Sequence, residues 1–451
     1  MNTSIQITPL EQQLNATVLL PGSKSITNRA LILSACCSGF TILEHVLESE
    51  DTQIMLGALR ELGVTIDRQE NKISSQDNII ISGLGGLITK PNAEIYIGNS
   101  GTSVRFLTAL LALSGRGEYR LYGKPRMHQR PISGLVDALR FLGANIRYEN
   151  NNGSPPLFIG CRNKLGKKII ESGKVEIAVS GDVSSQFLSA VLMTAPIASD
   201  EIDVEIIVTE KLVSRPYVEM TINIMESFGV KPTINNDFTS FRFHQGEFYH
   251  PPGVYRIEPD ASAASYFFAA AAICGGTIQI EGLSQKSVQG DIKFVDCLEQ
   301  MGCTVKFDNE KNTTTVSRSP NKPIKGISVD MNYISDTAQT LGVVALFAEG
   351  TTEIKNIEHV RYKETDRIAA LATELRRFGA TVEEQHDGLK IIPPAEIKPA
   401  TVETYDDHRM AMSFAAAGLK IDGVVIKNPD CVQKTFPNFF NELKKLLVVS
   451  G

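Results

Sequence analysis

The sequence predicts an α/β protein of two domains, built from repeated helix and strand units. Three observations lead to this fold class. The chain has 451 residues, more than one hydrophobic core usually supports. Its 42% hydrophobic and 21% charged residues are ordinary values for a folded, water-soluble protein. An amphipathic helix that ends at a glycine and leads into a β-branched strand recurs along the chain.

Five segments carry this pattern of helix, glycine and strand, and NFFNELKKLL near the C-terminus is a truncated sixth copy. A second, Ala/Leu-rich helix followed by a short alternating strand recurs in phase with them. One glycine-ended helix is common in any α/β protein, but six units in phase across two domains predict three units per domain. The segments are 55–66, 135–146, 221–232, 294–305 and 371–382, with left-handed caps expected at Gly63, Gly143, Gly229, Gly302 and Gly379.

The boundary between the domains is expected between the third and fourth units. The turn-rich stretch 244–255 is the best candidate for a linker there. A first strand from Ser4 to Leu20 precedes all the units, and the local sequence leaves open which domain it joins.

Charge and cysteine content exclude several classes of protein. A net charge of -6 gives no global basic field for nucleic acid, so an anionic substrate must meet a local cluster of cations. Seven cysteines, an odd number without a C-x-x-C pair, argue against a disulfide framework and a zinc site, and we expect buried thiols. There is no basic leader at the N-terminus and no uninterrupted apolar run of membrane-spanning length, so a cytoplasmic protein is expected.

Two strand-to-helix turns in the N-terminal half could bind an anion. Pro21 to Arg29 follows an apolar strand and offers Lys24, Ser25 and Arg29 beside a helix N-terminus. Asn99 to Arg105 has a glycine where a ligand could approach the backbone. Plain helix starts explain the first equally well and the second better. Gly83 to Gly86 lacks the third glycine of a dinucleotide fingerprint, so a nicotinamide or flavin site is dismissed.

Further polar segments follow in both halves. Arg126 to Pro131 offers a possible arginine fork, whereas 181–186 and 214–217 offer neutral donors. Each alone is better explained as turn chemistry. In the C-terminal half, 361–367 would place Lys363 and Arg367 on one helical face, as in a solvated ion-paired helix.

The cationic loops of the C-terminal half include Asp406 to Arg409 and Lys434 to Pro437. They occupy equivalent positions in the repeated units, which favours a functional role. Symmetric placement would allow both domains to direct cations at one ligand.

Taken in order, nine segments resemble the 5-enolpyruvylshikimate-3-phosphate synthase family of enolpyruvyl transferases, from LPGSKSITNRA to QKTFP. The resemblance implies two domains, each of three βαβαββ units: residues 22–256, and residues 1–21 plus 257–451. Hinges are then expected near 21–22 and 256–258, with closure of the domains on substrate. The segments are GNSGTSVR, PRMHQRPI, SSQFLSAVLM, SRPY, EPDASAASYF, QGDIKF, RYKETDR, DDHRMAM and KTFP.

The resemblance also implies an activity. Enolpyruvyl would pass from phosphoenolpyruvate to the 5-hydroxyl of shikimate 3-phosphate by addition and elimination, with release of phosphate, in aromatic amino acid biosynthesis. No cofactor, no metal, no nucleic acid and no membrane are expected, and the chain should be a monomer.

Matched residue by residue, the resemblance makes Asp336 the base for the 5-hydroxyl, and Glu364 with Lys24 the proton donor to the methylene carbon. Phosphoenolpyruvate is expected to contact Lys24, Gly101, Arg130, Gln186, Arg367, Arg409 and Lys434. Shikimate 3-phosphate is expected to contact Lys24, Ser25, Arg29, Ser184, Ser185, Gln186, Ser214, Tyr217, Asp336, His359 and Lys363.

Four departures from the family pattern stand out. His359 replaces a frequent Asn, so a pH-dependent substrate contact is expected there. Phe106 replaces a common Pro and Ser100 a common Ala, near the site of the family's inhibitor glyphosate. His128-Gln129 replaces a frequent Lys-Glu pair.

Two alternatives to this family agree less well with the sequence. The sister transferase that uses UDP-N-acetylglucosamine has Lys-Asn where this chain has Lys24-Ser25, and a cysteine in the loop that here runs from Gly117 to Pro131. A non-catalytic phosphate-binding module would have no reason to keep Asp336 and Glu364.

Overall fold

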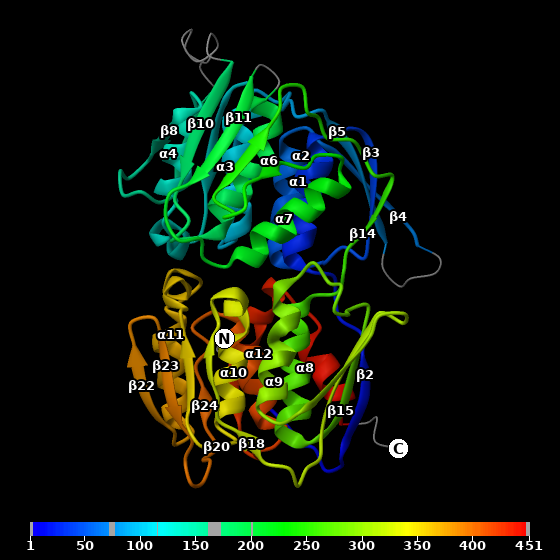
Figure 1. The fold of residues 1–451 in the computed structure, drawn as a ribbon, viewed down its shortest axis with the longest axis vertical. Coiled ribbons are helices and arrows are strands. Elements are labelled where there is room, and N and C mark those ends of the chain that lie inside the picture. The colour runs from blue at the N-terminus through cyan, green and yellow to red at the C-terminus, as the bar shows by residue number, and fades with distance from the viewer. Residues whose placement is uncertain (1–2, 72–76, 115, 161–172, 200–201, 448–451) are drawn as a thin grey trace. The chain divides into compact units, whose positions relative to one another are not determined.

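The structure is a computed structural model that describes residues 3–71, 77–114, 116–160, 173–199 and 202–447 (Figure 1). Its contacts divide the chain into two compact units. The amino-terminal unit is Gly22–Ile257, and the carboxy-terminal unit combines Met1–Pro21 with Glu258–Gly451.

The amino-terminal unit contains three four-stranded sheets that share one pattern, in the orders β14-β3-β5-β4, β6-β7-β9-β8 and β10-β11-β13-β12. In each sheet the first two strands are parallel and the next two pairings are antiparallel. The strands are β3 (Ser38–Glu44), β4 (Thr65–Gln69), β5 (Asn78–Leu84), β6 (Asn92–Tyr96), β7 (Glu118–Tyr122), β8 (Asn145–Tyr148), β9 (Leu157–Gly160), β10 (Lys174–Val179), β11 (Asp203–Val208), β12 (Thr233–Ile234), β13 (Ser240–Phe243) and β14 (Val254–Arg256).

Two kinds of helix alternate in this unit. The first kind is buried nearly all round and lies in the interior, and every residue of α3 is buried. The second kind is amphipathic and covers the outside with one apolar stripe. The interior helices are α1 (Lys24–Cys36), α3 (Gly101–Ser114) and α6 (Ser185–Ala198), and the outer helices are α2 (Glu50–Glu61), α4 (Ser133–Phe141) and α7 (Arg215–Ser227).

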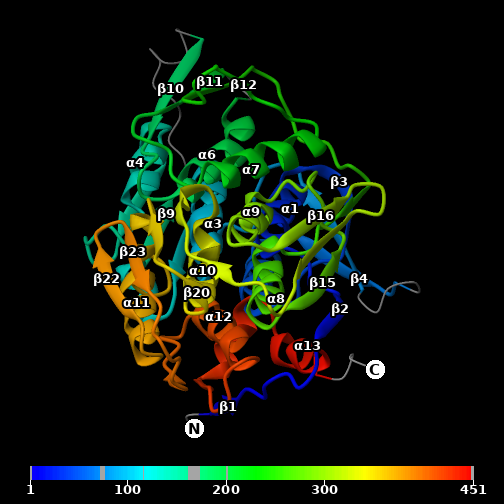
Figure 2. The same ribbon diagram turned by 60° about the horizontal axis from the view of Figure 1, so that its bottom comes forward.

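The carboxy-terminal unit repeats the sheet pattern in β2-β15-β17-β16 and β19-β21-β23-β22. A third sheet has three strands, β1-β25-β24, and sets the N-terminal strand beside the last one (Figure 2). The strands are β1 (Ser4–Gln6), β2 (Leu14–Val18), β15 (Gly276–Glu281), β16 (Thr304–Asp308), β17 (Thr313–Arg318), β19 (Ser328–Asp330), β21 (Thr352–Lys355), β22 (Thr381–Gln385), β23 (Gly388–Ile392), β24 (Thr401–Val402), β25 (Val425–Lys427) and the separate pair β18 (Ile324–Lys325) and β20 (Ala348–Glu349).

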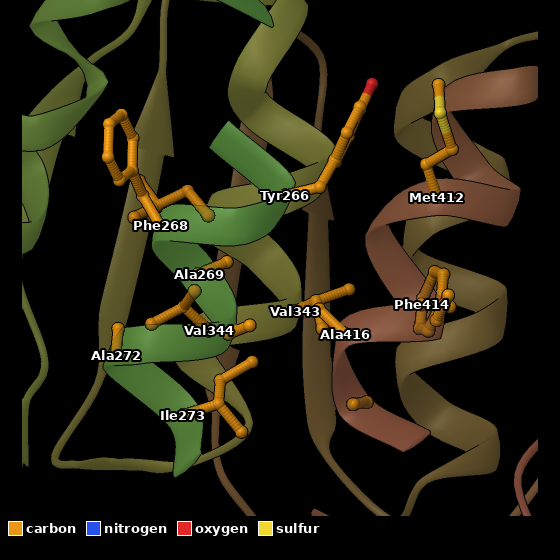
Figure 3. Close-up of a cluster of buried hydrophobic side chains, with 14 of the residues drawn as sticks. Tyr266, Phe268, Ala269, Ala272, Ile273, Val343, Val344, Met412, Phe414 and Ala416 are labelled. Atoms are coloured by element: carbon orange, nitrogen blue, oxygen red, sulfur yellow. The ribbon is translucent and has the colours of Figure 1, made fainter. Parts of the chain in front are cut away.

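The core of the carboxy-terminal unit lies among three interior helices, α8, α10 and α12, whose apolar side chains interdigitate (Figure 3). The Tyr266 hydroxyl of α8 points away from the other labelled side chains. The interior helices are α8 (Ala261–Cys274), α10 (Ala338–Ala345) and α12 (His408–Gly418), and the outer helices are α9 (Phe294–Gln300), α11 (Arg367–Arg377) and α13 (Phe439–Lys445).

Among the described residues, short 3-10 turns precede four of the outer helices, α4, α9, α11 and α13, and the interior helix α10. They carry many of the polar residues considered below. They are η1 (Pro125–Gln129), η2 (Gly290–Lys293), η3 (Asn332–Thr337), η4 (Glu358–Tyr362) and η5 (Pro429–Lys434).

The predicted mixed α/β class is confirmed, and so is the pattern of helix, glycine and strand. Each of the five cap glycines has a positive φ, from 85° to 107°. The sixth copy forms α13, but the sheet β1-β25-β24 has one strand fewer than the others. Six equivalent units therefore stay a prediction.

Two sequence-based expectations are wrong. The segment 4–20 is not one strand, because β1 and β2 belong to different sheets. The stretch 244–255 is not a free linker, since Tyr249 donates a hydrogen bond to the Met193 carbonyl and β14 pairs with β3. Apolar burial of Tyr249 holds this stretch to the amino-terminal unit.

The described cysteines are free thiols, five of them buried, as expected; Cys161 lies outside the described residues. Within the described ranges, no helix combines the length and the apolar character needed to cross a membrane.

Helix α2 offers a matched pair of glycine substitutions. A Cβ on Gly57 would meet nothing within 4 Å, so Gly57→Ala should stabilise the protein by about 0.5–1 kcal/mol through helix propensity. Gly63 has φ 94°, so Gly63→Ala should destabilise it by about 1–2 kcal/mol. Urea unfolding of both variants measures the difference, and equal effects would contradict the assigned cap.

Candidate functional site

Polar residues collect where the interior helices begin. In the amino-terminal unit α1, α3 and α6 begin at Lys24, Gly101 and Ser185. In the carboxy-terminal unit, Asp407 caps α12 and Asp336 lies just before α10. The free N–H groups and dipole of a helix N-terminus favour bound anions.

Lys24 is the first residue of α1, where a cation faces the unfavourable end of the helix dipole. Its Nζ lies 3.5 Å from Oδ2 of Asp51, a buried carboxylate in the first turn of α2. The neighbouring carboxylate, Glu50, is exposed and pairs with Lys124 instead. Asp51 therefore compensates the charge of Lys24 from a second helix.

Arg29 is buried, and the protein itself occupies most of its donors. Nε donates to Thr221 Oγ1 at 2.7 Å, and Nη2 donates to Ser189 Oγ and the Tyr217 carbonyl. Nη1 donates to the Ser25 carbonyl, and the guanidinium lies 5.2 Å from the Phe106 ring centroid. Burial lowers the pKa of Arg29 to about 10, so it remains a cation at neutral pH.

Gly101 lies between two guanidinium groups. Arg105 Nη1 donates to the Gly101 carbonyl at 2.9 Å, and Arg130 Nη1 donates to the Asn99 carbonyl at 3.0 Å. A Cβ on Gly101 would lie 2.3 Å from Arg130 Nη2 and 2.6 Å from Arg105 Nη1. Only glycine leaves room for both cations at this helix start.

Gln186, in the first turn of α6, is held in one orientation. Its Oε1 accepts from Arg105 Nη1 at 3.1 Å, and its Nε2 donates to Thr102 Oγ1 at 3.2 Å. Ser184 caps the helix by accepting from the Gln186 N–H. Ser214 occupies the N-cap position of α7 in a left-handed conformation, φ 51°, a sparsely populated region for a residue with a side chain. The ten matched residues of this unit are here called the Lys24 cluster: Lys24, Ser25, Arg29, Gly101, Arg130, Ser184, Ser185, Gln186, Ser214 and Tyr217.

The carboxy-terminal unit brings seven charged side chains together as the Asp336 cluster. At its centre Asp336 Oδ1 lies 3.1 Å from both Lys363 Nζ and Arg367 Nη1. Asp336 Oδ2 lies 2.6 Å from Arg409 Nη2. The members are Asp336, Lys363, Glu364, Arg367, Asp407, Arg409 and Lys434.

Arg367 is the most connected member and only 2% exposed. Its Nε donates to Asp407 Oδ2 at 2.8 Å, and its Nη2 donates to Glu364 Oε2 at 2.8 Å. Burial disfavours its charge, yet Asp407, Glu364 and Asp336 together raise the pKa of Arg367 above its ordinary value. Arg367 is therefore fixed as a cation.

Glu364 Oε1 also lies 3.3 Å from Lys434 Nζ, which completes the cluster. Four cationic and three anionic side chains give it one net positive charge. An anionic ligand would therefore be attracted to it, although carboxylates already contact several of the cations.

His359 of η4 is buried beside this cluster, and its Nε2 lies 2.9 Å from Ser335 Oγ. Burial, and then the charge of Lys363, lower the pKa of His359 to about 3. Without a ligand the imidazole is therefore neutral near pH 7, and a pH-dependent contact of His359 with the substrate stays a prediction.

Asp291 of η2 is a further buried carboxylate, and Ser262 donates a hydrogen bond to it. Burial, and then the negative charge of Asp336, raise the pKa of Asp291 to about 6. Within the described residues no group of three or more His, Cys, Asp or Glu side chains could hold a metal ion.

The structure corrects one local interpretation. The run 361–367 is not one helix, because η4 ends at Tyr362 and Asp366 caps α11, yet Lys363 and Arg367 still converge on Asp336. The turn expected at Arg126 to Pro131 is present as η1, where Arg126 Nη1 donates to Gln129.

Sequence reasoning missed Asp51 and Asp407 as site residues. Asp407 lies within the segment Asp406 to Arg409, but the sequence does not show which of its two adjacent aspartates points inward. Asp51 stands far from Lys24 in sequence, and no spacing rule connects them.

Comparison with known proteins gives one consistent result. The sequence profile of the family described as EPSP synthase (3-phosphoshikimate 1-carboxyvinyltransferase) matches residues 10–443. A protein of Shewanella pealeana named 3-phosphoshikimate 1-carboxyvinyltransferase is 44% identical over 98% of this chain and 99% of its own length. One of the same name from Shewanella oneidensis is 45% identical over 97% and 98%.

The fold is similar to that of a solved structure of EPSP synthase from Acinetobacter baumannii. The TM-score is 0.78 at 24% identity, over 99% of this chain and 98% of the other. At this identity the likeness concerns the fold alone.

The low pKa of His359 predicts how stability depends on pH. The unfolded chain binds a proton at His359 below about pH 6.5, whereas the folded chain does not until about pH 3. Relative to His359→Asn, the wild type should lose about 1.4 kcal/mol for each pH unit between these values. Denaturant unfolding from pH 7 to 5 measures this, with the exposed His386→Asn as control. Parallel curves for wild type and His359→Asn would contradict a buried neutral imidazole.

Proposed function

The chain belongs to the EPSP synthase family, and we propose that its Lys24 cluster and Asp336 cluster divide the work of the family's reaction between them. The enzyme transfers the enolpyruvyl group of phosphoenolpyruvate to the 5-hydroxyl of shikimate 3-phosphate and releases phosphate, a step of the shikimate pathway. The observation that carries the assignment of roles is the Asp336 cluster, where candidate base, candidate acid and three anion-binding cations share direct contacts.

Asp336 is the proposed base. In the addition step the 5-hydroxyl oxygen of shikimate 3-phosphate bonds to C2 of phosphoenolpyruvate, and the hydroxyl proton passes to the carboxylate. Its neighbours Lys363 and Arg367 hold Oδ1 in place, and Arg409 holds Oδ2.

Glu364, with Lys24, is the proposed source of the proton that C3 of phosphoenolpyruvate receives in the same step. Glu364 contacts Arg367 and Lys434, so its position is fixed from two sides. In the elimination step the bond from C2 to the phosphate oxygen breaks, the new methyl group returns a proton to Glu364 and the double bond forms again. Asp336 passes the proton that it took from the 5-hydroxyl to the departing phosphate. The departing phosphate carries the electron pair of the broken bond, and surrounding cations stabilise its charge.

Phosphoenolpyruvate carries a phosphate and a carboxylate, which guanidinium groups bind in a bidentate manner. We assign it to five cationic residues and to two residues in the first turns of α3 and α6: Lys24, Gly101, Arg130, Gln186, Arg367, Arg409 and Lys434.

Shikimate 3-phosphate carries hydroxyls as well as charges, and the assigned set is richer in neutral donors. The bonds of Arg29 within the protein use only one of the two hydrogens on Nη1, so a direct contact with this substrate is assigned to Nη1. The set is Lys24, Ser25, Arg29, Ser184, Ser185, Gln186, Ser214, Tyr217, Asp336, His359 and Lys363.

One chain supplies every residue of both sets, which supports the proposal of a monomeric enzyme. The cytoplasmic location and the division into two domains that close on substrate stay predictions.

A direct assay tests the function. Purified protein should release phosphate from phosphoenolpyruvate only when shikimate 3-phosphate is also present. Phosphate release without shikimate 3-phosphate, or with UDP-N-acetylglucosamine in its place, would contradict the assignment.

Glu364→Gln should lower turnover by about 100-fold, because glutamine keeps the shape but cannot deliver a proton to carbon. Shikimate 3-phosphate should still bind in a direct titration. Glu358→Gln is the matched control, since that carboxylate belongs to η4 and contacts His386 instead. Equal turnover of both variants would remove Glu364 from the proton transfer.

Arg130→Ala should weaken phosphoenolpyruvate by about 10- to 100-fold through lost charge-assisted hydrogen bonds. Shikimate 3-phosphate affinity should change little. Arg126→Ala, four residues earlier, removes a guanidinium bonded to Gln129 and serves as the control. Calorimetric titration of each substrate decides, and a similar loss for both substrates in Arg130→Ala would refute the assignment.

A further inference from the structure

Asp336 contacts the same cations that the proposed function assigns to phosphoenolpyruvate. Its two oxygens lie within 3.1 Å of one lysine and two arginines, and Arg367 and Arg409 are both assigned to the substrate phosphate or carboxylate. A carboxylate and a phosphate compete for the same guanidinium edges, because both offer paired oxygen acceptors. Asp336 therefore stands where a substrate anion has to bind.

The three carboxylates of the Asp336 cluster differ in how far their side chains are exposed. Asp407 is fully buried and also caps α12 by accepting from the Arg409 N–H. Glu364 is 6% exposed and contacts two cations. Asp336 is the most exposed of the three at 13% and comes from η3, a short turn interrupted by non-helical dihedrals at Ile334.

Arg367 keeps most of its bonds if Asp336 leaves. Its Nε and Nη2 donate to Asp407 and Glu364, whereas Nη1 is the nitrogen that contacts Asp336. Arg409 likewise contacts Asp336 through Nη2, and Nη1 lies 3.4 Å from the Tyr266 hydroxyl. If a phosphate replaced Asp336 at Arg367 Nη1 and Arg409 Nη2, the remaining contacts would still orient both arginines toward the phosphate.

The same contacts limit Asp336 as a base. The hydrogens of three neighbouring cations point at both of its oxygens, so these oxygens are engaged before any substrate arrives. A dianionic phosphate carries more charge than one carboxylate and competes for the same guanidinium groups. Binding of the phosphate would therefore release the oxygens of Asp336 for contact with the substrate hydroxyl.

We propose that Asp336 has a second role besides that of base: it is an internal anion that occupies the Arg367–Arg409 pair until a substrate phosphate replaces it. No proton moves in this exchange; two guanidinium–carboxylate contacts are replaced by two guanidinium–phosphate contacts. Proton abstraction from the 5-hydroxyl then depends on the presence of phosphoenolpyruvate. This role rests on the proposed function of Asp336 as the base, but the competition for arginines exists with any oxyanion.

The test is the affinity of inorganic phosphate and of phosphoenolpyruvate, each alone, for wild type and Asp336→Asn. Removing the internal anion while keeping its shape should tighten both ligands by about tenfold, even though turnover is lost. Asp336→Glu, which keeps the charge, should bind phosphate much as the wild type does. Asp330→Asn is a matched control six residues earlier, where the carboxylate contacts Asn332 and Asn356 rather than the arginines.

Unchanged or weaker phosphate binding by Asp336→Asn would overturn the proposal. If this variant does not fold in phosphate-free buffer, added phosphate should restore it and raise its Tm far more than that of the wild type. A variant that stays unfolded at saturating phosphate would also overturn it. A wild type that binds phosphate but shows no turnover with both substrates would refute the proposed function instead, and the phosphate titration would still decide this inference.

Discussion

Burial of the Arg367 guanidinium is the constraint on which the carboxy-terminal unit depends. A buried cation costs several kcal/mol unless carboxylates with good geometry surround it. Here those carboxylates come from three separate places in the chain: η3, the turn before α11, and the cap of α12. One buried charge therefore fixes the relative positions of three elements, and removal of any partner would leave it poorly compensated.

The interior helices make such a cluster possible. The bodies of α8, α10 and α12 fill the core with mainly apolar side chains, some of which Figure 3 shows, and the buried hydroxyls of Ser265, Thr340 and Ser413 hydrogen-bond to one another between the helices. Their first turns are left to carry the charged residues, at the ends where backbone N–H groups attract anions. The amino-terminal unit follows the same plan, with Lys24, Gly101 and Ser185 opening its interior helices. The bodies of these helices thus form the core, and their polar first turns form the candidate site.

The fold could be predicted well from the sequence where a pattern is local. The five cap glycines were found because a left-handed residue after an amphipathic helix has a composition signal. The break between β1 and β2 was missed, since alternation along 4–20 does not reveal that two sheets share the segment. The candidate site residues come from ordered motifs and stay a prediction, whereas the same motifs did not indicate Asp51 and Asp407, the carboxylates that contact them. The tertiary fold brings the partners of a buried charge close to it, and a single sequence does not show which residues these are.

Stability and catalysis make conflicting demands on the Asp336 cluster. Binding a polyanion requires several cations close together, but such cations repel one another in the absence of ligand. The protein reduces this repulsion with three carboxylates: Asp407 also caps α12, Glu364 contacts two cations and Asp336 contacts three. Asp336 is the most exposed of the three and is also the residue proposed to accept the substrate proton. If one residue were the stabilising anion and another the base, the anion would stabilise the free protein. It would also keep the arginines occupied against the substrate phosphate. With both proposed roles in Asp336, the arriving substrate phosphate replaces the negative charge of Asp336 beside the arginines. The same event frees the Asp336 carboxylate to act as the base.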